Sequence, residues 1–265
     1  GNNNAQYALG TLWLETGSGD SGQAVEWLTK AANAEHPAAQ YVLGKLYQDG
    51  VYFNKDMDQA MKWFRSAAEL GNEYAAYRMG CLLLLGEEIP KDVEAAVKWL
   101  SLSAEKGNPY AQYRLGMLYL KGEEFSPQVE VAMKWLQQAA EQKNEWAFYQ
   151  LGKLYLSGEH VTKNVETAVH YLGLCAEKGN QYAQYVLGKL YLCGRDVSRD
   201  REKAVEYLTA SAEQGNLYAS FLLEHLDAYQ DPSLFLAATR LLHHLEKLFC
   251  EEVQRPMEMK RYQID

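Results

Sequence analysis

The sequence holds few residues whose types and spacing could support metal binding or catalysis. His243, His244 and Glu246 stand close together, but adjacent histidines point to different sides of a helix. His243 with Glu246 would supply two ligands, whereas zinc takes three or four from a protein. The sequence has no Gly-rich phosphate loop, Gly-x-Ser-x-Gly elbow or HExxH motif. We therefore expect no enzymatic activity, no metal and no cofactor.

Aromatic residues form a clearer pattern, because most of the 19 tyrosines recur in three columns. One column consists of Tyr47, Tyr119, Tyr155 and Tyr191. A second, the Tyr185 column, consists of Tyr7, Tyr41, Tyr77, Tyr113, Tyr149 and Tyr185. A third, the Trp146 column, consists of Tyr74, Tyr110, Trp146, Tyr182 and Tyr218. Aromatic side chains with a polar edge are typical of protein-binding surfaces.

The direction of each column depends on the helix that carries it. At about 100° per residue, Tyr191 lies close to the core leucine Leu187, so its column is expected to be structural. The Tyr185 and Trp146 columns lie roughly 140° to 160° from that leucine, and we expect both to face away from the core. Lys45, Lys153 and Lys189 share that face.

Two interpretations of the Tyr185 and Trp146 columns stay open. The Tyr185 column could pack between neighbouring helices or form a contact surface. The Trp146 column varies more along the chain, as partner-specific recognition requires, but it too could be structural.

An internal repeat sets the spacing of these columns. The glycines at 44, 80, 116, 152 and 188 stand 36 residues apart, and the aromatic of an Ala-x-x-Trp/Tyr motif recurs at the same interval from Trp27 to Tyr207. A period in the thirties is typical of a solenoid of helical hairpins. The sequence therefore predicts seven hairpins and no strands.

Each repeat is predicted to contain two antiparallel helices, named helix A and helix B. In the sixth repeat helix A runs from about Gln181 to Leu192, and Gly194 ends it because a left-handed residue there favours glycine. Helix B begins after an Asp or Asn whose side chain accepts free backbone amides. The predicted caps are Asp56, Asp92, Asn164 and Asp200. The predicted ends are Gly71, Gly107, Gly179 and Gly215, each followed by Asn.

A glycine also stands inside helix A of all six repeats, where it costs about 1 kcal/mol relative to alanine. This recurrence predicts that helix B of the same hairpin packs so closely that a Cβ would collide with it. The expected neighbours are the small residues Ala95, Ala96, Ala168 and Ala204.

The unit A-x-Y-x-L-G-x-L-Y-x-x-G, followed by V-x-x-D-x-x-K-A-V-x-W/Y-L-x-x-A-A-E-x-G-N, resembles the Sel-one-like repeat, a relative of the tetratricopeptide repeat. Six copies cover residues 1–216. The resemblance implies an all-α, right-handed superhelical solenoid whose concave side is lined by helix A and binds other proteins, with no catalytic residues. Lys143, Leu83 and Pro127-Gln128 depart from the pattern, and we expect them to alter local geometry only.

The repeat pattern breaks down towards the C-terminus. Residues 217–254 are predicted to form a degenerate seventh repeat and a capping helix, and residues 255–265 a polar tail. Phe221 to His225, Asp231 to Ser233 and Thr239 to His244 also resemble the end of repeat arrays in mobilisation relaxases of Gram-positive conjugative elements. Any nicking activity that this resemblance implies would belong to chain outside these residues.

Composition and cysteine usage narrow the class of protein. The formal charge of −9 argues against binding to a phosphate backbone, and no apolar run is long enough to cross a membrane. Secreted cysteine-rich members of the resembled family pair their cysteines regularly, and this chain does not, which favours a cytoplasmic location. Gly1-Asn2 matches the register of Gly179-Asn180, so we expect both ends to be truncated.

We predict a bacterial scaffold that binds a protein or peptide through an aromatic concave groove. The predicted contact residues are Tyr77, Tyr110, Tyr113, Trp146, Tyr149, Lys153, Tyr182, Tyr185 and Lys189. One alternative is an architectural part of a mobilisation relaxase without a groove of its own. A nucleic-acid reader is the other, and it would need a basic groove. The sequence leaves the oligomeric state open.

Overall fold

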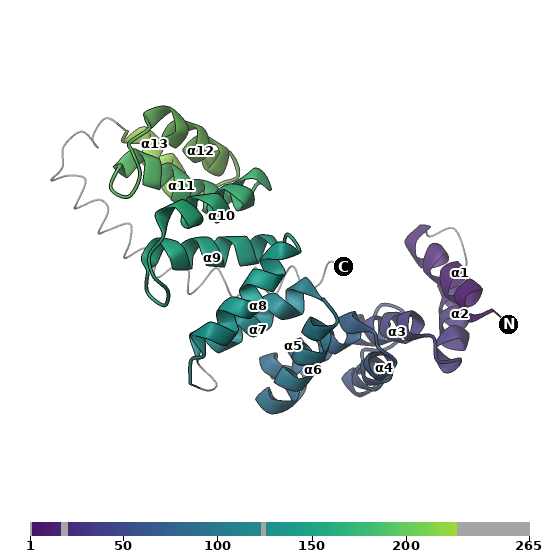
Figure 1. Cartoon of the computed structure of the whole chain (residues 1–265). Helices are drawn as coiled ribbons and strands as arrows, with labels where there is room; N and C mark the ends of the chain where they lie inside the picture. Colours follow the sequence, from purple (N-terminus) through teal and green to yellow (C-terminus); the bar gives the residue numbers. More distant parts are fainter. Residues whose placement is uncertain (1, 17–20, 123–125, 227–265) are drawn as a thin grey trace. The chain divides into compact units, whose positions relative to one another are not determined.

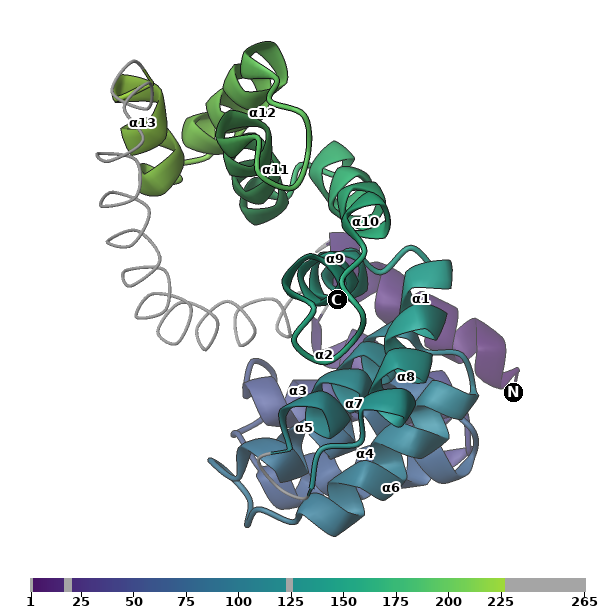
Figure 2. The same cartoon turned by 60° about the vertical axis from the view of Figure 1, so that its left-hand side comes forward.

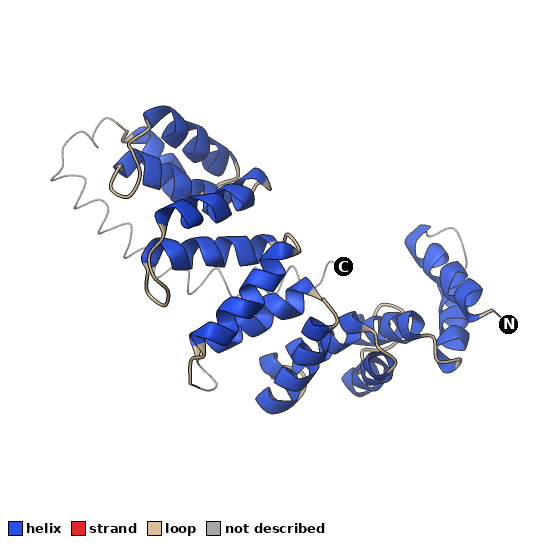
Figure 3. Cartoon of the chain, in the orientation of Figure 1, coloured by secondary structure: helices blue, strands red, loops and turns tan. Residues whose placement is uncertain are grey.

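The computed structural model describes residues 2–16, 21–122 and 126–226, which form thirteen α-helices (Figure 1). The helices are α1 (Asn3–Thr16), α2 (Ser21–Asn33), α3 (Pro37–Asp49), α4 (Met57–Glu69), α5 (Glu73–Leu85), α6 (Val93–Glu105), α7 (Pro109–Lys121), α8 (Val129–Glu141), α9 (Glu145–Ser157), α10 (Val165–Glu177), α11 (Gln181–Cys193), α12 (Arg201–Glu213) and α13 (Leu217–Glu224). The described residues outside the helices are loops, and none forms a strand (Figure 3). The prediction of an all-α repeat fold is confirmed.

Odd-numbered helices are the A helices and even-numbered helices the B helices of successive hairpins. In the described residues, the extensive contacts join helices that are consecutive in the sequence. Contacts divide the chain into two compact units, Gly1–Leu151 and Gly152–Asp265. Within the first unit, α3, α5 and α7 lie side by side with α4, α6 and α8 next to them (Figure 2).

The predicted helix B caps are confirmed. Asp56 accepts the amide N–H of Gln59 at 2.9 Å, and the other three predicted caps make the same bond. They are Asp92, Asn164 and Asp200. At the departure Pro127-Gln128, Gln128 makes no capping hydrogen bond through its side chain, so α8 begins without this stabilisation.

The helix ends follow the predicted glycine pattern. Gly194 closes α11 in the left-handed region, with φ of +62°, and four of the B helices, α4, α6, α10 and α12, are followed by the left-handed glycines Gly71, Gly107, Gly179 and Gly215. Lys143 replaces one of these glycines and keeps the left-handed backbone, with φ of +62°. Glu35 does the same after α2, with φ of +59°. A side chain in this region is strained, because its Cβ approaches the following carbonyl.

The glycine inside helix A lies against helix B, as predicted. A Cβ on Gly116 would lie 2.7 Å from Leu136 Cγ and 3.2 Å from the carbonyl oxygen of Ala132. Gly80 and Gly188 have the same surroundings, with Leu100 and Leu208 as the nearest side chains. The main neighbour is therefore a core leucine, whereas the sequence had indicated small residues; Ala96 and Ala204 contribute their carbonyl oxygens.

The structure describes only the beginning of the predicted seventh repeat, as α13. The predicted capping helix, the polar tail, and His243, His244 and Glu246 lie outside the described residues, as does most of the relaxase-like segment. These predictions stay predictions.

Candidate partner-binding surface

The Tyr185 column is buried along most of its length. The exposed fractions of Tyr77, Tyr113, Tyr149 and Tyr185 lie between 3% and 9%. The expectation that these four side chains face away from the core is therefore wrong. The rotation angle around helix A shows only which residues face helix B of the same hairpin. It does not show that helix A of the next repeat packs against another side of the same helix.

Tyrosines of the Trp146 column pack against the rings of the Tyr185 column. The ring centroids of Tyr41 and Tyr74 are 6.3 Å apart, and those of Tyr77 and Tyr110 are 6.2 Å apart. Tyr185 and Tyr218 repeat this tilted contact in the second unit at 6.1 Å. Each pair joins an A helix to the A helix of the next repeat.

The Trp146 column is also the more accessible of the two. Tyr74 is 51% exposed and Tyr110 is 44% exposed, while Trp146, Tyr182 and Tyr218 are half-buried. An exposed tyrosine that rests on a buried one presents an apolar face and a hydroxyl in a restrained position. Such residues can contribute strongly to binding because little side-chain entropy is lost.

Lysines lie beside two rings of the Tyr185 column, that of the half-buried Tyr41 and that of the buried Tyr185. Lys45 Nζ lies 5.9 Å from the ring centroid of Tyr41, and Lys189 Nζ lies 5.6 Å from that of Tyr185. Both distances allow a cation–π interaction. The rings of Tyr41 and Tyr185 thus contact a lysine of their own helix and a tyrosine of the next repeat.

The predicted contact residues fall into both units. Tyr77, Tyr110, Tyr113, Trp146 and Tyr149 belong to the first unit, and Lys153, Tyr182, Tyr185 and Lys189 to the second. Among them, the structure brings Tyr77 to Tyr110 and Tyr185 to Lys189.

Sequence reasoning missed two features of this surface. The contacting tyrosines are separated by 33 residues, as in Tyr77 and Tyr110, and this constant offset could have predicted their pairing. His36 caps α3 where later A helices have Asn, and its ring stacks on Tyr7 with centroids 4.7 Å apart. No regularity in the sequence pointed to this contact.

The cysteines of the described residues are buried or half-buried. Cys81 and Cys175 are buried cysteines that form no disulfide. Burial raises the pKa of the half-buried Cys193 thiol, which makes it a weak nucleophile. The part of the chain that the structure describes contains no group of three residues able to hold a metal ion. It also contains no helix with the length and apolar character needed to cross a membrane.

Together, these features define an α-solenoid of helical hairpins with an aromatic surface on its A helices. The Sel1 repeat profile matches six segments, residues 3–36, 37–72, 73–108, 109–144, 147–180 and 181–216. The chain therefore belongs to the Sel1 repeat family, whose members generally act as protein-interaction scaffolds. No curated protein matches the chain significantly.

Solved structures share the fold. A protective antigen of uropathogenic Escherichia coli, c5321, is 32% identical with a TM-score of 0.81; the match covers 85% of this chain and 49% of that chain. A Sel1 repeat protein from Oxalobacter formigenes is 31% identical with a TM-score of 0.72, and the match covers 80% and 86% of the two chains. The immunity protein PA5088 from Pseudomonas aeruginosa, 22% identical over 80% of each chain with a TM-score of 0.52, shares the fold alone.

Proposed function

We propose that the chain binds a partner protein or peptide through the aromatic surface of its A helices and catalyses no reaction itself. The observation that carries this proposal is the exposure of Tyr74 and Tyr110 on two successive A helices, each in contact with a tyrosine of the preceding repeat. Membership of a family of interaction scaffolds supports the same function. The cysteines of the described residues form no disulfide, which is consistent with a cytoplasmic location, and we propose this location as well.

Burial divides the predicted contact residues into two roles. Tyr110, Trp146 and Tyr182 belong to the more accessible column and would contact the partner. The buried residues would hold these contact residues in place; they are Tyr77, Tyr113, Tyr149 and Tyr185. Lys153 and Lys189 would favour acidic or carboxylate groups on the ligand through their charge.

The experiment compares how variants of the A helices and variants of the B helices bind a partner. A partner is first isolated by pull-down with the full chain as bait and is then produced separately. Its affinity for the full chain and for the double variant Tyr74→Ala/Tyr110→Ala is measured by calorimetry. We expect binding at least about tenfold weaker, since aromatic residues in contact with a partner are typical hot spots. Helicity should be unchanged in circular dichroism, because both side chains are substantially exposed.

The matched control replaces exposed residues of the B helices, Lys98→Ala and Lys134→Ala, and should change the affinity little. If the lysine variants abolish binding and the tyrosine variants leave it intact, recognition uses the B helices and the proposed surface is wrong.

A further inference from the structure

The two exposed tyrosines of the Trp146 column are each followed by an arginine one turn later on the same helix. Tyr74 precedes Arg78 on α5, and Tyr110 precedes Arg114 on α7. Residues four apart lie on the same side of a helix, so each arginine belongs to the aromatic surface proposed above. Both arginines are half-buried, and both lie in the first unit.

The arginines are confined to these two repeats. The other members of the Trp146 column are half-buried, and they are followed at the same distance by uncharged residues, which are Gln150, Val186 and Leu222. An exposed ring and a guanidinium therefore occur together on α5 and α7. This part of the aromatic surface combines apolar contact area with positive charge.

Charge is divided between the A and B helices of the three hairpins that α3 to α8 form. The A helices α3, α5 and α7 carry four basic and two acidic side chains, whereas the B helices α4, α6 and α8 carry four basic and six acidic ones. The two acids of these A helices, Asp49 and Glu73, stand at the last residue of α3 and the first residue of α5. The middle of these A helices is therefore positive, in a chain whose formal charge is −9.

Arg78 makes no ion pair and no side-chain hydrogen bond with the residues that the structure describes. Lys45 stands 33 residues before it, the offset that also separates the contacting rings of Tyr41 and Tyr74. The two basic residues thus stand one turn beyond these rings on both helices. The nearest acid on either helix, Asp49, is a further turn away. Basic groups gathered in this way attract an anionic ligand.

We propose that this surface of the first unit binds an acidic segment of the partner protein, and that Arg78 and Arg114 select it. The inference rests on the proposed function, because it requires the partner to lie on Tyr74 and Tyr110. Each guanidinium pairs with a carboxylate through two N–H groups, and the ring one turn before it contacts the apolar part of the segment. The same charges reject a basic segment.

The probe is a synthetic peptide of Glu-Pro-Ser repeats with fluorescein at its N-terminus. Proline favours the polyproline II conformation, in which every third side chain points the same way and lies about 9 Å further along. Packed helices are separated by about 8 to 10 Å, so successive glutamates can reach Arg78 and Arg114. A peptide of Gln-Pro-Ser repeats has nearly the same shape without the charge and serves as the control ligand.

Binding to the full chain is followed by fluorescence anisotropy. We expect a dissociation constant on the order of 100 μM for the Glu-Pro-Ser peptide and binding at least about tenfold weaker for the Gln-Pro-Ser peptide. Arg78→Gln/Arg114→Gln should weaken binding of the acidic peptide by about tenfold. Lys62→Gln/Arg65→Gln removes the same charge from exposed positions of α4 and should weaken binding by less than about twofold.

Two further measurements separate recognition of charge from loss of the fold. Arg78→Lys/Arg114→Lys keeps both charges and should bind the acidic peptide more tightly than the glutamine variant does. With the unaltered chain, the affinity for the acidic peptide should fall as salt is raised, because accessible ion pairs are screened.

The inference is overturned if the Gln-Pro-Ser peptide binds as tightly as the Glu-Pro-Ser peptide, if both double glutamine variants reduce binding equally, or if salt has no effect. If any of these results is found while Tyr74→Ala/Tyr110→Ala still weakens binding of the isolated partner, the proposed function stands and only the acidic ligand is wrong.

Discussion

At the scale of single residues, two glycines inside helices have opposite surroundings. A Cβ on Gly116 would lie 2.7 Å from Leu136 Cγ, whereas a Cβ on Gly173 in α10 meets no atom within 4 Å. Gly116→Ala should lower the free energy of unfolding by about 1 to 3 kcal/mol, because overpacking exceeds the gain in helix propensity. Gly173→Ala should raise it by about 0.5 to 1 kcal/mol. Urea denaturation measures both, and equal effects would contradict the close contact at Gly116.

Lys143 adopts a left-handed backbone that glycine adopts at equivalent positions. Lys143→Gly should therefore stabilise the chain by about 1 kcal/mol, since the strain of the Cβ is removed. The reciprocal control is Gly179→Ala, at φ of +85° with open space around the site, which should destabilise by a similar amount. A loss of stability in Lys143→Gly, measured by urea denaturation, would show that contacts of the lysine side chain outweigh the strain.

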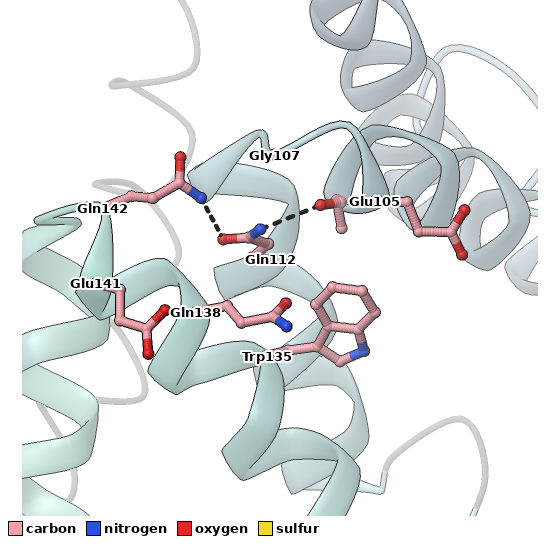
Figure 4. Close-up of a pocket in the computed structure, with 8 residues that line it drawn as sticks. Glu105, Gly107, Gln112, Trp135, Gln138, Glu141 and Gln142 are labelled. Atoms are coloured by element: carbon pink, nitrogen blue, oxygen red, sulfur yellow. Dashed lines mark hydrogen bonds between the residues drawn. The ribbon is translucent and has the colours of Figure 1, made fainter.

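The sequence predicted local features such as these well, because they depend on residues near in the chain. The caps at Asp56 and Asp92 and the left-handed glycine at 194 follow from side-chain and backbone chemistry within one turn. The burial of Tyr77 did not follow, because Tyr110 of the next repeat packs against its ring. The pocket lined by Ala104, Gln112 and Trp135 also brings together residues of three helices (Figure 4), which no single repeat pattern contains.

At the scale of elements, glutamines connect neighbouring hairpins. Gln142 donates to Gln112, which donates to the end of α6, and Gln214 and Gln184 form the same chain towards the end of α10. Gln40 makes the equivalent bond to the end of the preceding helix B, donating from its Nε2 to the carbonyl oxygen of Ala32. Its buried Oε1 has no hydrogen-bond partner, because Leu70 occupies the position of the donor glutamine.

Leu70→Gln should complete this chain in the second repeat. Leu70 is 45% exposed, so the substitution removes little buried apolar area and supplies a donor to a buried acceptor. We expect the free energy of unfolding to rise by about 1 kcal/mol. Leu70→Ala, which offers no donor, should give no such gain, and Gln142→Leu should lose a similar amount. Calorimetric melting of the three variants tests this, and equal effects of Gln and Ala at position 70 would exclude the hydrogen bond.

At the scale of the whole molecule, the stability of a repeat array is the sum of repeats and their interfaces. Extensive contacts in the described residues join consecutive helices only, so a defect is transmitted through one interface at a time. Leu28 and Leu172 allow a matched test, because both are fully buried helix B leucines in contact with a helix A glycine, Gly10 and Gly152 respectively.

Leu28→Ala and Leu172→Ala should each leave a cavity that costs about 2 to 5 kcal/mol. In hydrogen exchange followed by mass spectrometry, we expect Leu28→Ala to accelerate exchange in α1 to α3 and leave α10 to α12 unchanged. Leu172→Ala should do the reverse, since local opening in a solenoid does not require distant repeats to unfold. Accelerated exchange across all helices in both variants would instead show a single cooperative unit, and the description of stability as a sum over neighbouring repeats would be wrong for this chain.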